Sequence, residues 1–529
     1  MNILFAAAEN GALPGGKVGG IGDVVRDLPP ALAARGCRVT VVTPSHGFLH
    51  RTPGARAIGA CPFLFRGAFH EAELYRIAPA ASSPGVTHAV VHHPALTAFD
   101  GHQGREVVYA HDPPDRPFFT DGSRFAFFGA ALVSAVAGGR LGTFDLLHLH
   151  DWHAALAALL ARFHPDYRTL GELPIVFSIH NLAFQGVRPL RGSESSLEAW
   201  FPELPYDWSA VADPRWPDCV NPMAVGIRLA DRVHTVSPTY AAEILRPDRK
   251  PAYFGGEGLE ADLASAHDSG RLVGILNGCH YPETPGAQPL SFPSLLALVR
   301  EEAVGWSGAG DTVPAAQFIA FARSLTAGAD EPPPDVLLTS VGRVGEQKML
   351  LLRHPGSDGR PALDAVLTGV GARGCLLLLG SGDRDYERWL TAAAARHPNF
   401  IFVNGYSDRL ARALYAAGDL FVMPSSFEPC GLSQMLAMRE GQPCVVHAVG
   451  GLKDTVAHGR NGFAFEGDGL EAQVDRFVET TLAAVALKRD QPETWEEIRR
   501  EAAATRFTWS ETAERYLADL YPPPATATS

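Results

Sequence analysis

The chain has 529 residues, of which 46% are hydrophobic and 19% charged, and its formal net charge is −13. This length exceeds what one hydrophobic core supports and fits two large α/β domains. The negative charge argues against a general nucleic-acid-binding surface. No apolar run reaches the length of a membrane span, so we expect no membrane partner.

The start of the sequence and its cysteines indicate a cellular compartment. A strand pattern begins at the third residue. It lacks the basic region, long apolar region and cleavage site of a secretory signal, so we expect no signal peptide. The seven cysteines are scattered, and no two form a Cys-x-x-Cys pair. This usage is typical of reduced, packed thiols and argues against a zinc site. We therefore expect a cytoplasmic protein.

The first half of the chain alternates short apolar runs with helical patterns. Helices are expected at residues 22–34 and 154–163, and strands at residues 3–7, 39–43, 144–150, 175–179 and 232–236. Strands separated by helices predict parallel βαβ units. Residues 57–93 differ, because alternating apolar residues between Gly and Pro turns predict an antiparallel hairpin or meander.

The second half begins after a region rich in Pro, Gly and Ala. Residues 281–334 have the composition of turns and a linker. Five further strands are expected at residues 337–342, 375–379, 400–403, 420–423 and 444–446. Residues 509–521 carry the apolar periodicity of an amphipathic helix, and residues 522–529 are expected to be disordered. The expected domains are therefore 1–272, then 273–506 with the linker inside it, and a terminal segment 507–529.

A glycine loop with one lysine follows the first strand. Lys17, Gly19 and Gly20 stand in this loop, which opens the first helix. Glycines let a backbone approach an anion closely, and a helix N-terminus offers free N–H donors and a positive dipole. Lys17 adds a point charge. The loop is a candidate phosphate site, with a plain glycine turn as the alternative. It is not Gly-x-Gly-x-x-Gly, so a dinucleotide site is not favoured.

Polar residues follow two strands of the first half. His150 and Asp151 come directly after one strand, and His180 and Asn181 follow the next. In parallel α/β sheets, ligands bind at the carboxyl ends of the strands. Such side chains suit sugar hydroxyls, which need both donors and acceptors. A lone histidine is more often a structural residue, but two clusters on adjacent strands favour a site.

A basic loop follows the first strand of the second half. Arg343 and Lys348 lie five residues apart. An arginine fork and a compact ammonium together can clamp a diphosphate. The alternative is a solvated basic surface. Gly380 belongs to a further glycine turn at a strand end, which is either part of a nucleotide pocket or a plain turn.

Glu428 is the strongest single candidate. It follows the apolar strand 420–423 and precedes Gly431 and Leu432, where a helix is expected to begin. A carboxylate there is placed to accept sugar hydroxyls. The alternative is an acidic residue that only complements the helix dipole. Position 436 is leucine, so the second glutamate found at this spacing in many nucleotide-sugar transferases is absent.

Together these residues resemble the bacterial glycogen synthases and plant starch synthases, of glycosyltransferase family 5. The matching segments run in the same order over nearly the whole chain. They are residues 17–24, 150–153, 179–186, 235–240, 275–278, Arg343 with 346–348, 427–432 and 450–456. The family pattern has different residues where this chain has Val18, His280, Met349 and Ser426, which bear on donor preference and rate more than on reaction class.

The resemblance implies a fold, a reaction and further site residues. The fold would be GT-B, with two Rossmann-like domains facing an interdomain cleft and the last helix crossing back to the first domain. The reaction would transfer glucose from ADP-glucose to the non-reducing end of glycogen or another α-1,4-glucan, with retention and with neither metal nor cofactor. Asn277, Cys430, Gly431 and Leu432 would contact substrate by their places in the matching motifs.

We assign roles by what this chemistry needs. Arg343, Lys348 and the loop with Lys17 would neutralise the leaving diphosphate, because charge stabilisation dominates such transfers. Glu428 and His180 would orient the glucose, with Asp151 and Asn181 nearby. Two alternatives stay open. One is another GT-B transferase, or a phosphorylase with a pyridoxal-phosphate lysine. The other is a catalytically weak glucan-binding homologue.

Overall fold

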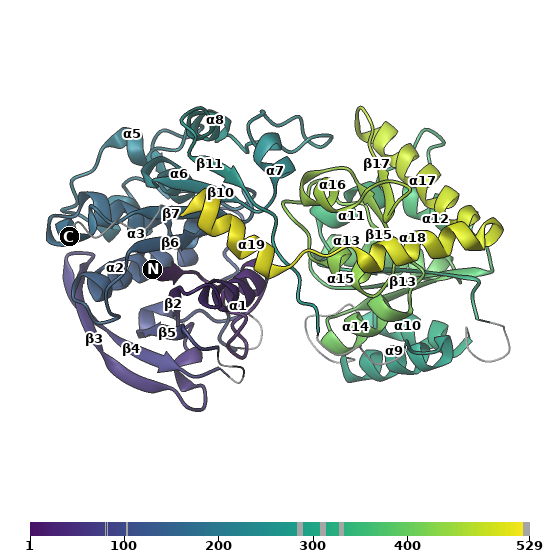
Figure 1. The fold of residues 1–529 in the computed structure, drawn as a ribbon, viewed down its shortest axis with the longest axis horizontal. Coiled ribbons are helices and arrows are strands. Elements are labelled where there is room, and N and C mark those ends of the chain that lie inside the picture. The colour runs from purple at the N-terminus through teal and green to yellow at the C-terminus, as the bar shows by residue number, and fades with distance from the viewer. Residues whose placement is uncertain are drawn as a thin grey trace. The chain divides into compact units, whose positions relative to one another are not determined.

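The computed structural model describes residues 1–79, 81, 83–101, 104–282, 289–306, 314–326 and 333–521. Contacts divide the chain into two compact units. The first contains Met1–Asp248, Gly255–His280 and the segment from Thr508 onward, and the second contains Arg249–Phe254 and Tyr281–Phe507. Each unit is built on its own mostly parallel sheet with helices on both faces (Figure 1). The expected disordered tail, 522–529, lies outside the described residues.

The sheet of the first unit has nine strands in the order β11-β10-β7-β6-β1-β2-β5-β4-β3. Their bounds are β1 Asn2–Ala6, β2 Arg38–Pro44, β3 Arg56–Phe65, β4 Ala68–Ile77, β5 Val86–His92, β6 Leu146–His150, β7 Ile175–Ile179, β10 Arg232–Thr235 and β11 Leu272–Gly274. From β5 to β11 the neighbours are parallel, in the order of a Rossmann sheet that reverses between β1 and β6. Strands β8 Arg188–Pro189 and β9 Cys219–Val220 form a separate two-stranded antiparallel sheet.

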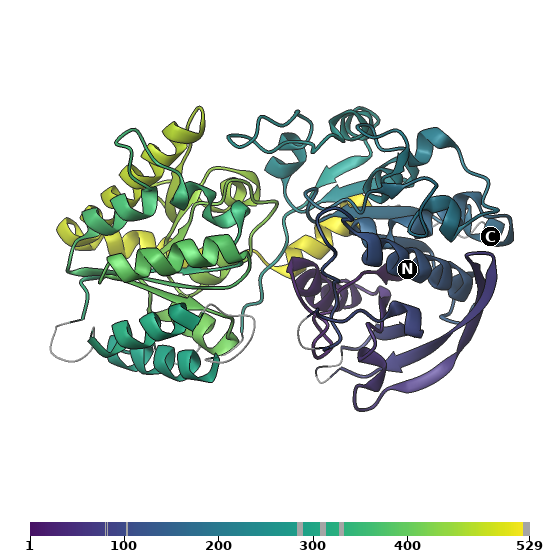
Figure 2. The same cartoon turned by 180° about the vertical axis from the view of Figure 1, so that it is seen from behind.

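The expected antiparallel meander is confirmed. Strands β3 and β4, of ten residues each, form an antiparallel hairpin, and β4 pairs antiparallel with β5. This hairpin is the outer edge of the sheet, drawn in purple in Figures 1 and 2. Its burial alternates, with Cys61, Phe63 and Phe65 inside and their neighbours turned to solvent. That period of two is what one covered face of a sheet requires.

Helices cover both faces of the first sheet. They are α1 Gly20–Ala33, α2 Phe119–Ala137, α3 Asp151–Phe163, α4 Leu197–Trp200, α5 Trp208–Val211, α6 Pro222–Leu229, α7 Pro238–Glu243, α8 Glu260–Asp268 and α19 Trp509–Arg515. One core lies under α2, α3, α6 and α8. The other lies under α1 and α19. Because both faces of the parallel strands are covered, strands such as β6 and β7 are buried along their whole length rather than at alternate residues.

The last helix packs on the first unit, as the resemblance implied. Helix α19 lies beside α1 (Figure 1), and Arg35 forms an ion pair with Glu514. A π-helical turn, Tyr516–Leu520, continues it. Behind this turn, the hydroxyl of Tyr521 hydrogen bonds to Nδ1 of His148 at 2.9 Å. The C-terminal segment thus completes the core on one face of the first sheet.

The second unit has a parallel six-stranded sheet in the order β14-β13-β12-β15-β16-β17. The bounds are β12 Val336–Val341, β13 Gly374–Gly380, β14 Phe400–Asn404, β15 Leu420–Met423, β16 Cys444–His447 and β17 Gly462–Phe465. In chain order this is 3-2-1-4-5-6, the Rossmann order, and it reverses between β12 and β15. Five of the six strands match the sequence expectation. The four residues of β17 were not predicted.

Helices also cover both faces of the second sheet. They are α9 Phe292–Trp306, α10 Pro314–Thr326, α11 Glu346–Arg353, α12 Ala362–Val370, α13 Arg384–Arg396, α14 Asp408–Ala417, α15 Ser433–Arg439, α16 Gly450–Thr455, α17 Leu470–Asp490 and α18 Pro492–Ala504. One core contains residues of α11, α12, α13 and α17. The opposite core contains residues of α9, α14 and α15. The sheet is therefore buried on both sides.

The linker expected at 281–334 is wrong for the residues that the structure describes there. Helices α9 and α10 occupy 292–306 and 314–326 and pack against each other and against β14. Leu295, Leu296 and Val299 recur at helical spacing and are fully buried. The Gly and Pro residues that suggested a linker flank these helices. Composition over a long window therefore masked two short apolar periodicities.

Among the described residues, none of the helices combines the length and the apolar character that crossing a membrane requires.

Candidate functional site

The candidate residues lie where each sheet reverses its strand order. In the first unit, β1 leads into the glycine loop and β6 leads into Asp151. In the second unit, β12 leads into the loop with Arg343, and β15 leads into the segment with Glu428. In open α/β sheets this reversal is the place where ligands bind. Each unit therefore has a candidate site at its own switch point.

In the glycine loop, three of the N–H groups that were expected to be free are already bonded. Oε2 of Glu9 accepts hydrogen bonds from the backbone N–H groups of Val18, Gly19 and Gly22, at 2.8, 2.6 and 3.3 Å. Lys17 is 39% exposed, and its Nζ forms an ion pair with Asp23 at 2.8 Å. The loop thus presents a cation to solvent, while its amides face a carboxylate of the chain itself.

Strands β6 and β7 bring Asp151 and His180 together. The strands pair in parallel, with His150 opposite Ser178. Oδ1 of Asp151 then accepts a hydrogen bond from the backbone N–H of His180 at 2.7 Å. Asp151 has φ +53°, in the left-handed region. Such a conformation costs a non-glycine residue on the order of 1–3 kcal/mol and concentrates at functional sites.

The ring of His180 is held neutral. Its Nε2 hydrogen bonds to Nδ1 of His150 at 2.9 Å, and the two rings stack. Burial lowers the pKa of His180 to about 3, so the ring carries no charge near neutrality. His150 is also depressed well below its ordinary pKa, first by burial and then by the neighbouring His148. His180 is therefore suited to exchange neutral hydrogen bonds with a sugar hydroxyl rather than to supply charge.

Replacing Asp151 by asparagine is expected to change how stability depends on pH. Burial raises the pKa of Asp151 from 3.8 to about 8, although backbone N–H groups of His180 and Asn181 favour its charged form. Above the unfolded pKa, the unfolded chain releases this proton while the folded chain keeps it. The stabilisation that Asp151 contributes is therefore full below the unfolded pKa and is lost as the pH rises towards about 8.

The measurement is urea unfolding of both proteins at about pH 5 and about pH 8. The stability of the parent should fall relative to Asp151→Asn across this window. Histidines that titrate in the same range affect both proteins alike and cancel in the difference. Parallel stability profiles would show that Asp151 is ionised in the folded chain.

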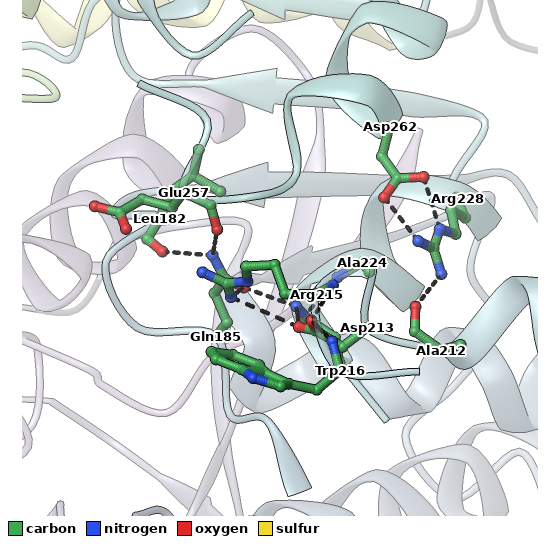
Figure 3. Close-up of polar contacts among 11 residues, drawn as sticks. Leu182, Gln185, Ala212, Asp213, Arg215, Trp216, Ala224, Arg228, Glu257 and Asp262 are labelled. Carbon is green, nitrogen blue, oxygen red and sulfur yellow. Dashed lines mark hydrogen bonds and ion pairs between the residues drawn. The ribbon is translucent and has the colours of Figure 1, made fainter. Parts of the chain in front are cut away.

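The loop after His180 is anchored by a buried glutamine. Figure 3 shows the side-chain amide of Gln185 donating to the carbonyl groups of Leu182 and Glu257, at 3.1 and 3.0 Å. Its Oε1 accepts hydrogen bonds from Arg215 and Asn221, at 2.8 and 2.7 Å. These four contacts join three segments far apart in sequence. The backbone that carries His180 is therefore fixed at both ends, by Asp151 and by Gln185.

Two further candidates of the first unit lie in different surroundings. The Oδ1 of Asn181 accepts a hydrogen bond from the N–H of Ala183 at 3.0 Å, so part of its polar capacity is used within the loop. Asn277 follows β11 and is 5% exposed. Its Oδ1 has no hydrogen-bond partner among the described residues. A buried, unpaired acceptor is uncommon and is consistent with a group that awaits a ligand or water.

In the second unit, Lys348 and Glu428 form an ion pair. Nζ of Lys348, on α11, contacts Oε2 of Glu428, and the hydroxyl of Ser425 donates to the same oxygen at 3.0 Å. Glu428 is 6% exposed. Helix α15 begins only at Ser433. Glu428 therefore does not complement the first turn of that helix, and the dipole alternative loses its geometric basis.

Backbone contacts hold the Glu428 segment in place. Ser426 donates its N–H to the carbonyl of Gln347 at 2.8 Å, and the Gln347 side chain donates to the carbonyl of Phe427 at 3.1 Å. On the other side, the carbonyl of Glu428 accepts the N–H of Gly451 at 3.0 Å. A Cβ at Gly450, where φ is +44°, would lie 1.9 Å from that carbonyl oxygen. Glycine is therefore required for this approach.

The remaining candidates of the second unit are one exposed arginine and several residues that shape the backbone. Arg343 is exposed and forms no hydrogen bond or ion pair with another described residue. Gly380 ends β13, and a Cβ there would meet the carbonyl oxygen of Gly342 at 2.1 Å. Cys430 is buried, Gly431 has φ +75°, and Leu432 is the N-cap of α15. The last three, residues 430–432, form the turn between Glu428 and α15.

Sequence reasoning missed Glu9, Gln185 and Ser425 as site residues. Glu9 is a buried acid shortly after β1, and Ser425 and Gln185 are uncharged. Glu9 and Gln185 have partners distant in sequence, such as Tyr109 and Arg215, whereas Ser425 contacts the nearby Glu428. The sequence feature that could have identified these residues is a polar side chain shortly after the end of a predicted strand. Asp383, which follows the glycine turn after β13, is the N-cap of α13.

Comparison with known proteins gives the same picture over the whole chain. Residues 2–265 match the family described as starch synthase catalytic domain, and residues 362–481 match glycosyl transferases group 1. A glycogen synthase of Streptococcus equi subsp. equi is 33% identical over 98% of this chain and 99% of its own. One of Anaeromyxobacter dehalogenans is 36% identical over 98% of both chains.

A solved structure is similar in fold. It is the catalytic domain of starch synthase IV from Arabidopsis thaliana, bound to ADP and acarbose. The TM-score is 0.74 at 24% sequence identity, and the match covers 98% of each chain. This agreement, with two Rossmann-like units, confirms the GT-B fold that was expected from the sequence.

Proposed function

The chain belongs to the glycogen synthase and starch synthase family of glycosyltransferases, and on this premise we propose that it transfers glucose from ADP-glucose to the non-reducing end of an α-1,4-glucan such as glycogen, with retention. The observation that carries the proposal is the buried Glu428, ion-paired with Lys348 at the switch point of the second sheet. A carboxylate held against a cation there suits a donor with both hydroxyls and phosphates.

The proposed roles divide between charge and orientation. Arg343, Lys348 and Lys17 would stabilise the leaving diphosphate, since fixed cations aimed at developing charge are the largest usual contribution to such transfers. Exposed Arg343 is available for this role. Glu428 and neutral His180 would orient the glucose. Asp151 would act through the backbone of His180, and Asn181 and Asn277 would offer amide groups to substrate.

The deciding experiment is a donor panel with glycogen as acceptor. ADP-glucose, UDP-glucose and GDP-glucose are supplied in parallel, and nucleoside diphosphate release and glucan chain extension are both measured. We expect extension with ADP-glucose that depends on added glycogen. Extension only with another donor would support a different GT-B transferase. Glucan binding without turnover from any donor would support the weakly catalytic homologue.

The phosphorylase alternative predicts a bound chromophore. Pyridoxal phosphate in an internal imine absorbs in the near ultraviolet and visible range, so an absorbance scan of the purified protein tests it. We expect only the aromatic band. Phosphate-dependent release of glucose 1-phosphate from glycogen, together with such a chromophore, would replace the transferase proposal.

Turnover is expected to be unaffected by excess EDTA. Arg343, Lys348 and Lys17 supply positive charge for the diphosphate. The one Asp-x-Asp segment is already used, since Asp383 accepts the N–H groups of Asp385 and Tyr386 as a helix cap. The measurement is ADP-glucose turnover with EDTA, with added Mg²⁺ and with neither. A strict requirement for a divalent cation would overturn the charge assignment and return Asp383 and Asp385 as ligand candidates.

We also propose the binding partners and the cellular location that were expected from the sequence. The partners would be ADP-glucose and a glucan, without nucleic acid or a membrane, and the location would be cytoplasmic. The absence of a resident cofactor is part of this proposal.

A further inference from the structure

The carboxylate of Glu9 lies beneath the glycine loop and is bonded on both oxygens. Oε2 accepts the backbone N–H groups of Val18, Gly19 and Gly22, at 2.8, 2.6 and 3.3 Å. Oε1 accepts the hydroxyl of Tyr109 at 2.8 Å. Glu9 is only 2% exposed. Three converging amides on one oxygen are the arrangement by which glycine loops bind phosphate, here made with a side chain of the same chain.

The contacts fit an ionised carboxylate. Oε2 meets only backbone N–H groups, which donate and cannot accept, so it has no partner for a proton of its own. Burial raises the pKa of the Tyr109 hydroxyl well above its ordinary value, and the charge of Glu9 adds to this, so Tyr109 stays a donor. Helix α1 has Gly19 at its N-cap and therefore no side-chain cap of its own. Glu9 supplies the missing acceptor at the positive end of the helix.

A second anion cannot use the same three amides while Glu9 is in place, because each of them already donates to Oε2. The loop is closely packed there, since a Cβ on Gly22 would lie 3.1 Å from Oε2 of Glu9 and 2.9 Å from Cγ of Lys17. A donor phosphate that used these N–H groups would have to displace a buried carboxylate and leave it without donors. The side chain of Lys17, in contrast, is partly exposed.

We propose that Glu9 is a positioning residue, which occupies the anion site made by the amides of Val18, Gly19 and Gly22 and holds the loop so that Lys17, and not these three amides, meets the diphosphate of the donor. The part that concerns turnover rests on the proposed function. The part that concerns the anion site does not, and it can be tested without any activity.

The first experiment asks whether removing Glu9 opens an anion site. Melting temperatures of the parent, Glu9→Ala and Ser407→Ala are measured with increasing sodium formate, at ionic strength kept constant with chloride. Ser407 caps helix α14 in the second unit with an uncharged hydroxyl. We expect both variants to melt below the parent. Formate should raise the melting temperature of Glu9→Ala alone, in a saturable way, because it replaces the lost carboxylate.

The second experiment measures turnover and ADP binding. Glu9→Gln keeps the shape and one acceptor oxygen but loses the charge. We expect kcat to fall by roughly ten- to a hundredfold, because a displaced catalytic group has effects of this order, while KM for ADP-glucose changes little. Formate should restore part of the kcat of Glu9→Ala. Isothermal titration should show ADP binding to both variants no tighter than to the parent.

Three outcomes would overturn the proposal or one part of it. Tighter ADP binding by Glu9→Ala would support the anion site but overturn the part that concerns Lys17, because it would mean that the three loop amides can reach the diphosphate. A melting temperature of Glu9→Ala that does not respond to formate would mean that no anion site exists there. Parent-like kcat in Glu9→Gln would reduce Glu9 to a helix cap. If Glu9→Ala does not fold, Glu9→Gln alone decides through its kcat and ADP affinity. A parent without transferase activity would refute the proposed function, while the formate titration would still decide on the anion site.

Discussion

Replacing Glu428 by glutamine is expected to lower turnover with ADP-glucose and glycogen on the order of a thousandfold or more. Glutamine keeps the shape but removes the charge and replaces one acceptor oxygen by an N–H donor. That donor would face the ammonium of Lys348 and the hydroxyl of Ser425, both of which now donate to Glu428. The chain should stay folded and keep its affinity for ADP, since Lys348, released from its partner, retains its charge.

The matched control is Asp419→Asn. Asp419 is also paired with a lysine of the second unit, Lys488, at 2.9 Å, but it precedes β15 whereas Glu428 follows it. Turnover, ADP binding by calorimetry and a melting curve are recorded for both variants. The control should lose some stability and keep its turnover. Normal turnover in Glu428→Gln would remove its sugar-orienting role, and joint loss of turnover and ADP binding would assign it a structural one.

Lys348→Ala is expected to lower kcat/KM about a hundredfold or more. Removing one preorganised charge donor typically costs on the order of 3 kcal/mol of transition-state stabilisation. The ion pair adds a second effect, because Glu428 would keep only Ser425 as a donor at its Oε2. A buried carboxylate without its cation is costly, so the melting temperature should fall as well.

Lys488→Ala separates these two effects. Its side chain is 19% exposed, as is that of Lys348, and it too is ion-paired. It lies near the start of the strands, at the opposite end of the sheet from the candidate site. Equal loss of stability in both variants, with activity lost only in Lys348→Ala, is the expected result. An activity of Lys348→Ala within about twofold of the parent, at limiting and saturating donor, would exclude Lys348 from the site.

Much of the fold could be predicted because parallel strands buried on both faces are continuous apolar runs. Residues 175–179 and 400–403 are of this kind, and both are strands as expected. The prediction failed where the signal was short or diluted. Strand β17 has four residues and begins with Gly462. Helices α9 and α10 stand among Pro and Gly residues, so their apolar periodicity was overlooked in favour of a linker.

The candidate site could be predicted in its residues but not in its contacts. His180, Asp151 and Glu428 were found because polar residues directly follow apolar strands, and the carboxyl ends of parallel strands share one edge. Their partners come from pairing that no local pattern encodes. Lys348 was assigned to phosphate and Glu428 to sugar as separate residues, and the structure joins them in an ion pair.

The sequence alone determined which residues stand at the strand ends, the α/β class and the family, because these depend on periodicity and on motifs of adjacent residues. Only the tertiary structure decided what each polar group meets. By sequence the N–H groups of the glycine loop were open to any anion, yet three of them donate to the carboxylate of Glu9. Hydrogen bonds reach only about 3 Å, so they are decided by how distant segments pack.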